Sequence, residues 1–507
     1  MFRQKTINVR MGARLFLWLA VSVCLTGCGQ PADDQNSDQA VETAPPPSIL
    51  IRNGTAVTGE GRQEVDIRIV EETIAEIGEL APIPSDTRVI DASGLLVLPG
   101  GIDAHTHLRA AEGFDVVDDY ETGTRSALAG GITTVGHMGV ELSGSLLPSQ
   151  LIEQESALIN AEALADMFVH YTVFNPSDAV VSDFPALIAA GQPSIKIFMP
   201  HQVGAPFPFP YDDNLADFEK VFVAAASAGL RVAVHAEDAD TIRTAVARLT
   251  DAGTTTLESY AESRPVQAEV TAVERAIEMA KRTGASIYLV HISAAEAIET
   301  LAQNSDAEVF VETRPIYLHL DASRYAAADG PLYVSAPPLR TLEDQDAVWA
   351  GMANGTIDTI ASDHLGWTPE QKMNPEQTIA SFLAGSNNMQ VMLPMLFSEG
   401  VNGGRLSLER FVELTATNPA RIFGMYPMKG TLAVGSDADI VLWDADEVRT
   451  IRNEDILSNS GFSIHAGAEV TGWPVLTLRR GEVVYEEGQV TAERGSGRLV
   501  ARKPIGG

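Results

Sequence analysis

The chain has 507 residues, of which 45% are hydrophobic and 20% are charged, a composition that excludes disorder as the state of most of the chain. Asp and Glu number 68 against 35 Lys and Arg, and the net charge of −33 argues against nucleic acid or an anionic lipid surface as the main partner. The 2 cysteines, Cys24 and Cys28, both lie near the N-terminus, so the rest of the chain contains neither a disulfide framework nor a cysteine metal site.

The N-terminus has the pattern of an export signal. Basic residues precede an apolar run at 15–23, which is too short for a membrane-spanning helix. The run ends in Leu25-Thr-Gly-Cys28, which resembles a bacterial lipobox and implies cleavage that leaves Cys28 to carry lipid. We predict a lipoprotein signal peptide at 1–27 and an exported protein, lipid-anchored to a bacterial membrane on its periplasmic face or at the cell surface. An ordinary signal peptide or an uncleaved anchor is the alternative.

Two strand-rich segments flank the body of the chain. Residues 28–47 are polar and acidic and end in prolines, which predicts a disordered tether. Residues 48–98 then contain short strand-like runs separated by Gly and Asp, and a similar stretch returns within 428–495. We predict that these two segments form one small β-sandwich domain built from both chain ends.

Residues 99–427 alternate apolar strand-like runs with Ala- and Leu-rich stretches of helical periodicity, as βαβ units do. The apolar runs are residues 101–107, 133–137, 168–174, 194–198, 231–235, 286–291, 308–312 and 359–363. Eight strands alternating with helices predict an α/β fold, a (β/α)₈ TIM-like barrel, in which the chemistry lies at the C-terminal ends of the strands.

Polar residues gather at those strand ends. They are His105 and His107 on the first run, His235 on the fifth, His291 on the sixth and Asp363 on the eighth. His105 and His107 are two residues apart on a strand, so both imidazoles share one face and can reach one metal ion. Lys196 lies inside the apolar fourth run, where an unpaired charge is costly, so it must lose its charge, pair with an acid or be modified. A single strand histidine is more often a packing residue, but the joint pattern indicates a metal site.

The segment Pro99-Gly-Gly-Ile-Asp-Ala-His-Thr-His107 resembles the opening motif of the amidohydrolase superfamily, in its cyclic-amidase branch of dihydropyrimidinases (hydantoinases), allantoinases and dihydroorotases. The similarity covers residues 49 to about 490. Further matching motifs follow in the order of the family: Ser194-Ile-Lys-Ile-Phe-Met199, Val234-His-Ala-Glu237, Pro337-Pro-Leu-Arg340 and Ser362-Asp-His364.

The resemblance implies a role for each polar residue at the strand ends. It implies a first ion bound by His105, His107 and Asp363, a second ion bound by His235 and His291, and a carbamate on Lys196, formed with CO₂, that bridges both. Zinc is the expected metal for these oxygen and nitrogen ligands. The resemblance further implies ring opening of a cyclic amide by a hydroxide that bridges both ions, with Asp363 taking its proton and passing it to the leaving nitrogen.

Some positions depart from the family pattern. Hydantoinases carry a Tyr oxyanion donor where this chain has His201, which either replaces that donor or is a loop residue pointing elsewhere. Arg109 matches the spacing of the dihydroorotase arginine that binds a substrate carboxylate, but the Asn that accompanies it there is missing from Met138-Gly-Val140. Arg109 is therefore a substrate-binding residue or a solvated loop arginine.

Other departures lie around the expected substrate pocket. Where hydantoinases have Glu-Thr-Cys-Pro-Gln-Tyr, this chain has Glu312-Thr-Arg-Pro-Ile-Tyr317. Ala336 and Ala384 stand where the family has Ser and Asn, at substrate-binding positions that hold the ring largely through the main chain. The metal site is therefore better supported than any particular substrate.

Three functions remain open. The first is a metal-dependent hydrolase of a cyclic amide, acting on a small-molecule amide close to a dihydropyrimidine or hydantoin. The second is an amidohydrolase with a shifted substrate, such as an acyl-amino acid, a dipeptide or a dihydroorotate-like acid. The third is a non-catalytic lipoprotein that uses the barrel as a binding scaffold. The resemblance also implies a homo-oligomer, a tetramer by analogy.

Overall fold

The computed structural model describes residues 48–80, 87–110, 115–141, 145–200, 211–304 and 308–505. The predicted signal peptide at 1–27, the predicted tether at 28–47, Cys28 and His201 lie outside the described residues. Residues Pro46–Gly507 form a single compact unit.

One sheet of the unit is entirely parallel. Its strands are β6 (Gly101–His107), β7 (Ile132–Gly139), β8 (Asp166–Thr172), β9 (Ser194–Phe198), β10 (Arg231–His235), β11 (Ser286–Leu289), β12 (Val309–Thr313), β13 (Thr359–Ile360) and β14 (His364–Leu365). The hydrogen-bonded order is β13-β12-β11-β10-β9-β8-β7-β6-β14. Neighbouring strands in this sheet are therefore consecutive in the chain, except for the pair β6 and β14.

The last two strands close this sheet into a barrel. β13 pairs with β12 at one edge and β14 pairs with β6 at the other edge. Only residues 361–363 separate β13 from β14 in the chain, so together they occupy the eighth strand position. Asp363 lies at this break, with a positive φ of 46°. The predicted TIM-like barrel is therefore confirmed, with an interrupted eighth strand.

Fifteen helices accompany the barrel strands in the described part of the chain. They are α1 (Tyr120–Ala129), α2 (Pro148–Glu162), α3 (Asp178–Ser182), α4 (Phe184–Ala189), α5 (Leu215–Ala228), α6 (Ala239–Asp251), α7 (Tyr260–Ser263), α8 (Val266–Thr283), α9 (Ala295–Ala302), α10 (Pro315–His319), α11 (Leu342–Asn354), α12 (Pro369–Lys372), α13 (Met389–Leu396), α14 (Leu408–Val412) and α15 (Asn418–Ile422). Single 3₁₀ or π-helical turns lie at Tyr211–Asp213, Leu257–Ser259, Ala322–Ala326, Gly330–Tyr333, Phe397–Asn402, Glu413–Thr417 and Asn453–Asp455.

Helix α8 shows why these segments are helical. Its buried positions, which include Ala272, Val273, Ala276 and Ala280, recur every three or four residues and form one apolar stripe against the barrel. The helix ends at Gly284, whose φ of 75° lies in the left-handed region that favours glycine. The helices cover the outer face of the barrel strands, and side chains of the strands fill the inside of the barrel. Burial on both faces explains the continuous apolar runs of the strands.

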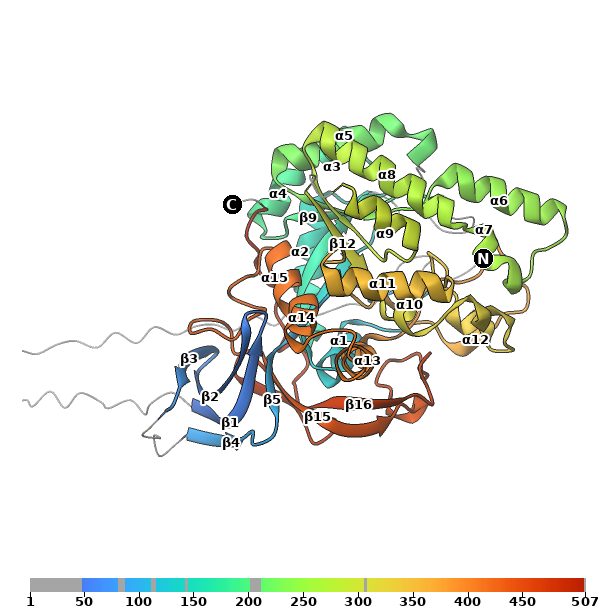
Figure 1. Cartoon of the computed structure of the whole chain (residues 1–507). Helices are drawn as coiled ribbons and strands as arrows, with labels where there is room; N and C mark the ends of the chain where they lie inside the picture. The colour runs from blue at the N-terminus through green and yellow to red at the C-terminus, as the bar shows by residue number, and fades with distance from the viewer. Residues whose placement is uncertain are drawn as a thin grey trace, which may run out of the picture. The chain divides into compact units, whose positions relative to one another are not determined.

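The second sheet is mixed and joins the two ends of the described chain. Its strands are β1 (Ser48–Thr58), β2 (Gly61–Val70), β3 (Thr73–Gly78), β4 (Thr87–Asp91), β5 (Leu96–Pro99), β15 (Ile440–Thr450), β16 (Glu469–Arg479), β17 (Glu482–Glu486) and β18 (Gln489–Val490). β5 makes the junction, because it pairs parallel with β1 and antiparallel with β15. In Figure 1 the blue and orange-red strands accordingly lie side by side.

The mixed sheet encloses an apolar cluster of its own. Ile51 and Ile67 from the N-terminal strands pack there with Ile440 and Leu478 from the C-terminal strands. The predicted small β-sandwich built from both chain ends is confirmed. The domain limits 48–98 with 428–495 and 99–427 stay a prediction, because the two sheets belong to one compact unit.

A buried ion cluster links the mixed sheet to the barrel. The Lys429 ammonium lies 2.9 Å from Asp166 at the start of β8, 3.0 Å from Asp437 and 2.7 Å from Asp439. Burial opposes the charge of Lys429, but the three carboxylates outweigh it and raise its pKa. The lysine thereby neutralises an acidic group that would otherwise suit a cation.

The C-terminal segment covers the start of the barrel strands. The Val500 amide donates to the Met167 carbonyl (2.7 Å), and the Met167 amide donates to the Arg498 carbonyl (2.8 Å). Met167 lies at the beginning of β8, so this segment lies at the end of the barrel opposite to the predicted site residues. The opposite end of the barrel, formed by the C-terminal ends of its strands, therefore remains the face on which a substrate can bind.

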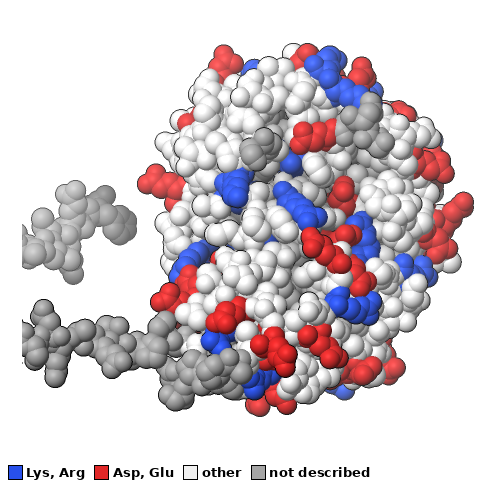
Figure 2. Space-filling model, turned by 60° about the vertical axis from the view of Figure 1, so that its left-hand side comes forward, with Lys and Arg blue, Asp and Glu red and all other residues white. Residues whose placement is uncertain are grey.

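Among the described residues, we find no helix with the length and apolar character needed to cross a membrane. Figure 2 shows acidic side chains spread over one face of the molecule, with basic side chains between them. The excess of acidic residues is thus distributed rather than gathered in one patch on this face.

Candidate active site

The first group of predicted ligands meets at the C-terminal end of β6. Asp363 Oδ1 lies 3.2 Å from His105 Nε2 and 3.1 Å from His107 Nε2. One ligand atom from each of the three residues lies within 4.8 Å of the others, as metal binding requires. Asp363 lies at the break in the eighth strand, and its side chain meets the two histidines of β6, which are far from it in the sequence.

The second group lies beside the first. His235, at the end of β10, places Nδ1 3.0 Å from Nε2 of His291, just beyond β11. The rings of His291 and His105 have centroids 5.7 Å apart, so both groups belong to one centre. The structure thus brings together the predicted ligands of both ions.

Lys196 lies in the same region, in the middle of β9. Its side chain is fully buried, and its Nζ has no hydrogen-bond partner among the described residues. Burial lowers the pKa of Lys196 to about 8, while the carboxylates of Asp363 and Glu312 act in the opposite direction. A lysine with a lowered pKa has more of the neutral amine that reacts with CO₂, so the residue fits the predicted carbamate.

His105 and His235 each keep one nitrogen for a metal because a carboxylate holds the other. His105 Nδ1 donates to Glu312 Oε1 (2.8 Å), and His235 Nε2 donates to Glu237 Oε2 (2.7 Å). Burial opposes ionisation of Glu237, but the Arg264 guanidinium and His235 outweigh it and hold its pKa at about 2. Carboxylates in this position fix the tautomer and orientation of metal-binding imidazoles. The donor set therefore fits divalent ions such as zinc.

Glu312 is a site residue that the sequence analysis did not assign. It lies on β12 with no exposed surface, and its Oε1 also accepts from the backbone amide of His291 (3.1 Å). Burial raises the pKa of Glu312 to about 8, and the charge of Lys196 opposes this rise. A cation at the neighbouring histidines favours its ionised form. The available signal was its position at the end of a strand, within a motif shared with hydantoinases.

Arg314 is the second unassigned residue, two positions further along the chain. Its side chain has no exposed surface, and Nη1 lies 3.0 Å from Asp363 Oδ2. Burial would raise the pKa of Asp363, but Arg314 together with His105 and His107 holds it well below the usual range. Asp363 therefore faces the histidines with one oxygen and a guanidinium with the other.

His364 anchors the position next to Asp363. Its Nε2 donates to Asp118 Oδ2 (2.9 Å), and the Asn459 amide donates to Asp118 Oδ1 (2.8 Å). The hydroxyl of Ser458 also donates to Asp118. A loop from the C-terminal part of the chain thus fixes the residue that follows the break in strand eight.

Similarity to known proteins identifies the family of this chain. Residues 96–484 match the model of the "Amidohydrolase family". A D-phenylhydantoinase of Escherichia coli O1:K1 / APEC is 35% identical over 465 residues, which cover 90% of this chain and 98% of the relative. The chain belongs to the amidohydrolase family.

Several solved structures have a fold similar to that of this chain. The dihydropyrimidinase from Brevibacillus agri NCHU1002 is 34% identical, with a TM-score of 0.85 over 91% of this chain and 100% of that structure. The L-hydantoinase (dihydropyrimidinase) from Arthrobacter aurescens is 31% identical, with a TM-score of 0.84 over 90% of this chain and 99% of that one. These names match the cyclic-amidase branch to which the sequence motifs point.

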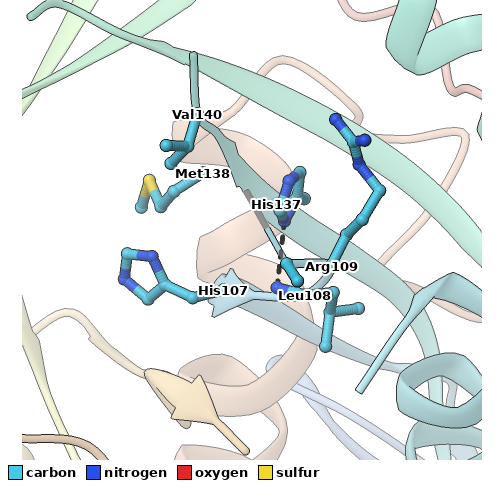
Figure 3. Close-up of a pocket in the computed structure, with 7 residues that line it drawn as sticks. His107, Leu108, Arg109, His137, Met138 and Val140 are labelled. Carbon is cyan, nitrogen blue, oxygen red and sulfur yellow. Dashed lines mark hydrogen bonds between the residues drawn. The ribbon is translucent and has the colours of Figure 1, made fainter. Parts of the chain in front are cut away.

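Arg109 is held by an acid outside the ligand cluster of this amidohydrolase. Its Nη2 lies 3.0 Å from Oε1 of the buried Glu155, which also accepts from the Tyr120 hydroxyl. Figure 3 shows the Arg109 side chain extending away from His107, although both residues line the same small pocket. The dashed line there marks the Leu108 amide donating to His137. A substrate role for Arg109 stays a prediction.

Ala336 and Ala384 lie on two loops that Lys372 ties together. The Lys372 ammonium donates to the Val334 carbonyl (3.0 Å) and to the Gly385 carbonyl. The Gly385 amide also donates to the Val334 carbonyl (3.0 Å). The two alanines are thus brought to the same region through their main chain, but their contact with a substrate stays a prediction.

Proposed function

We propose that this amidohydrolase opens a cyclic amide of the dihydropyrimidine or hydantoin type. The observation that carries the proposal is the convergence of Asp363, His105 and His107 beside the unpaired, buried Lys196 at the C-terminal ends of the barrel strands. The similarity to a D-phenylhydantoinase and to dihydropyrimidinases supports a ring amide as the substrate.

Two divalent ions, zinc by preference, fit the centre. His105, His107 and Asp363 would hold the first, His235 and His291 the second, and a carbamate on Lys196 would bridge them. When bound, such ions lower the pKa of water and polarise a carbonyl oxygen.

Side chains of the protein would transfer the proton of the attacking water. Asp363 is placed to accept a proton from the attacking water, because its Oδ1 faces the histidine ligands and the residue is only 9% exposed. The C–N bond of the ring breaks as Asp363 returns that proton to the leaving nitrogen. The product is an open-chain N-carbamoyl acid or a simpler cleaved amide. We propose His201 as the hydrogen-bond donor to the developing oxyanion, in place of the hydantoinase tyrosine.

The sequence supports an exported enzyme. We propose that the protein is lipid-anchored through Cys28 to a bacterial membrane, on its periplasmic face or at the cell surface, and that residues 28–47 act as the tether. By analogy with its family we propose a homotetramer. An enzyme in this place acts on amides that arrive from outside the cell.

The test is ring opening, followed by ultraviolet absorbance, with protein loaded with zinc in bicarbonate. The substrates are dihydrouracil, hydantoin, allantoin and dihydroorotate. Turnover of one ring supports the proposal. No turnover with two ions bound would contradict it and favour an acyl-amino acid or a dipeptide, whereas a protein without stoichiometric metal would favour the binding scaffold.

A further inference from the structure

Arg314 has donors that nothing in the described protein uses. The side chain is completely buried, yet Nε has no hydrogen-bond partner, and Nη1 faces Asp363 without the alignment of a hydrogen bond. Nη2 reaches only the Ser386 hydroxyl, at 3.4 Å. The Tyr317 side chain is a further polar neighbour of the guanidinium. Nε still has no hydrogen-bond partner among the described residues, so the edge formed by Nε and Nη2 is only partly satisfied. Leaving buried donors unpaired is costly, so this edge is suited to an acceptor that arrives with the substrate.

A second buried basic side chain, Lys372, lies near Arg314. Lys372 is also buried, at 1% exposed, and it bonds two carbonyls but forms no ion pair with a described carboxylate. Burial lowers the pKa of Lys372, and the positive charge of Arg314 lowers it further. The acids near Arg314 are Asp363 and Glu312, which also face the metal ligands. Divalent ions at those ligands would add further positive charge.

Arg314 occupies the centre, whereas Arg109 does not. Arg109 is compensated by Glu155 at 3.0 Å, so its charge is already neutralised. Arg314 approaches the same carboxylate that meets His105 and His107. A planar guanidinium binds a carboxylate through two parallel hydrogen bonds along one edge, which is the edge that Arg314 leaves open.

We propose that the substrate is a ring amide that carries a carboxylate and that Arg314 binds this carboxylate through its Nε and Nη2 edge. The inference rests on the proposed ring hydrolysis and narrows its substrate class. By the resemblance to hydantoinases described above, Arg314 stands at the position of a cysteine in their motif. In this proposal Arg314 binds the carboxylate, and the ring itself lies at the predicted substrate positions Ala336 and Ala384, on the loops that Lys372 connects.

Two pairs of compounds test the inference. Dihydroorotate and dihydrouracil differ by one carboxylate, and orotate and uracil are the corresponding rings that the reaction does not consume. We would measure kcat/KM for the first pair and calorimetric binding for the second, with zinc-loaded protein. The variants are Arg314→Cys, which restores the hydantoinase residue, and Arg314→Lys, which keeps the charge. Arg405→Cys is the matched control, because Arg405 is a surface residue with 45% of its side chain exposed.

The inference predicts that wild-type protein prefers dihydroorotate and binds orotate more tightly than uracil. Arg314→Cys should lower the dihydroorotate to dihydrouracil ratio of kcat/KM by about 10- to 100-fold, mainly through KM, which is the range for a charge-assisted hydrogen-bonded pair. Arg314→Lys should lower it less, and Arg405→Cys should leave it unchanged. The ratio cancels any effect of the variants on Asp363, because both substrates need that residue equally.

Three outcomes separate this inference from the proposed function. Equal losses for both substrates would overturn the inference, since Arg314 would then act only through Asp363. Equal binding of orotate and uracil to wild-type protein would overturn it too, even where the variants do not fold, while dihydrouracil opening would still support ring hydrolysis. If neither ring is opened but orotate binds in an Arg314-dependent way, the carboxylate site at Arg314 is supported and the proposed ring hydrolysis is contradicted.

Discussion

Replacing Glu312 by Gln should weaken metal binding without changing the shape of the site. Glu312 Oε1 lies 2.8 Å from His105 Nδ1 and 3.1 Å from the His291 amide, so one carboxylate orients ligands of both proposed ions. A glutamine keeps an oxygen in this place and removes the negative charge. Carboxylates behind metal-bound histidines contribute about 10- to 100-fold to metal affinity, or about 1.4–2.7 kcal/mol.

The assay is a zinc titration of the metal-free protein against a chromophoric chelator. We expect Glu312→Gln to raise the zinc dissociation constant by about 10- to 100-fold. The control is Glu269→Gln, because Glu269 is equally buried but bonds Ser293 and Arg340 instead of a proposed ligand. It should lower thermal stability and leave the zinc affinity within about twofold of wild type, as expected for a group outside the ligand shell. Equal zinc affinities of Glu312→Gln and wild type would refute the role of Glu312.

Three further changes follow from the contacts of single residues. Lys196→Ala should remove one equivalent of metal and all ring-opening activity; retention of full activity with two bound ions would show that Lys196 is not a bridging ligand. Asp118→Asn weakens the hydrogen bond to His364 and should lower kcat by about 10-fold, as loss of a charged hydrogen-bond partner does. The circular dichroism spectrum should stay unchanged, and an unaltered kcat would contradict this prediction. Burial raises the pKa of Asp358 from 3.8 to about 6. The protonated side chain therefore contributes to the free energy of unfolding, and this contribution is fully present below pH 3.8. It is lost as the pH rises through 6, which lowers the free energy of unfolding by about 3 kcal/mol. Asp358→Asn should therefore raise the Tm, relative to wild type, more at pH 8 than at pH 4, and equal shifts at both pH values would contradict the assignment.

Barrel strands were predictable where local sequence determines them. The apolar runs 101–107, 194–198 and 231–235 coincide with β6, β9 and β10, because strands covered on both faces need continuous apolar residues. The eighth run was expected at 359–363, but the structure breaks it after Ile360 and resumes pairing at His364. That break brings Asp363 to the histidines, and it depends on pairing with β12 and β6 rather than on local composition.

The predicted ligands came together because their place at strand ends follows from topology. Contacts between distant segments were not predictable in the same way. Glu312 and His105 are 207 residues apart, and Asn459 and Asp118 are 341 residues apart. In the sequence, Arg314 is a departure from the hydantoinase motif that begins at Glu312, but only the fold shows that its guanidinium reaches Asp363. Arg109 was expected near a substrate through its spacing, and the fold shows the acid that neutralises it.

The most direct test of the account is to count metal and measure ring opening on the same protein sample. Metal-free protein would be titrated with zinc in bicarbonate while the opening of the ring that it prefers is followed by ultraviolet absorbance. The account predicts that activity rises with bound zinc and reaches its maximum at two equivalents, and that Lys196→Ala never reaches it. Ring opening at full rate without metal, or none at two equivalents with any of the four rings, would contradict the central claim.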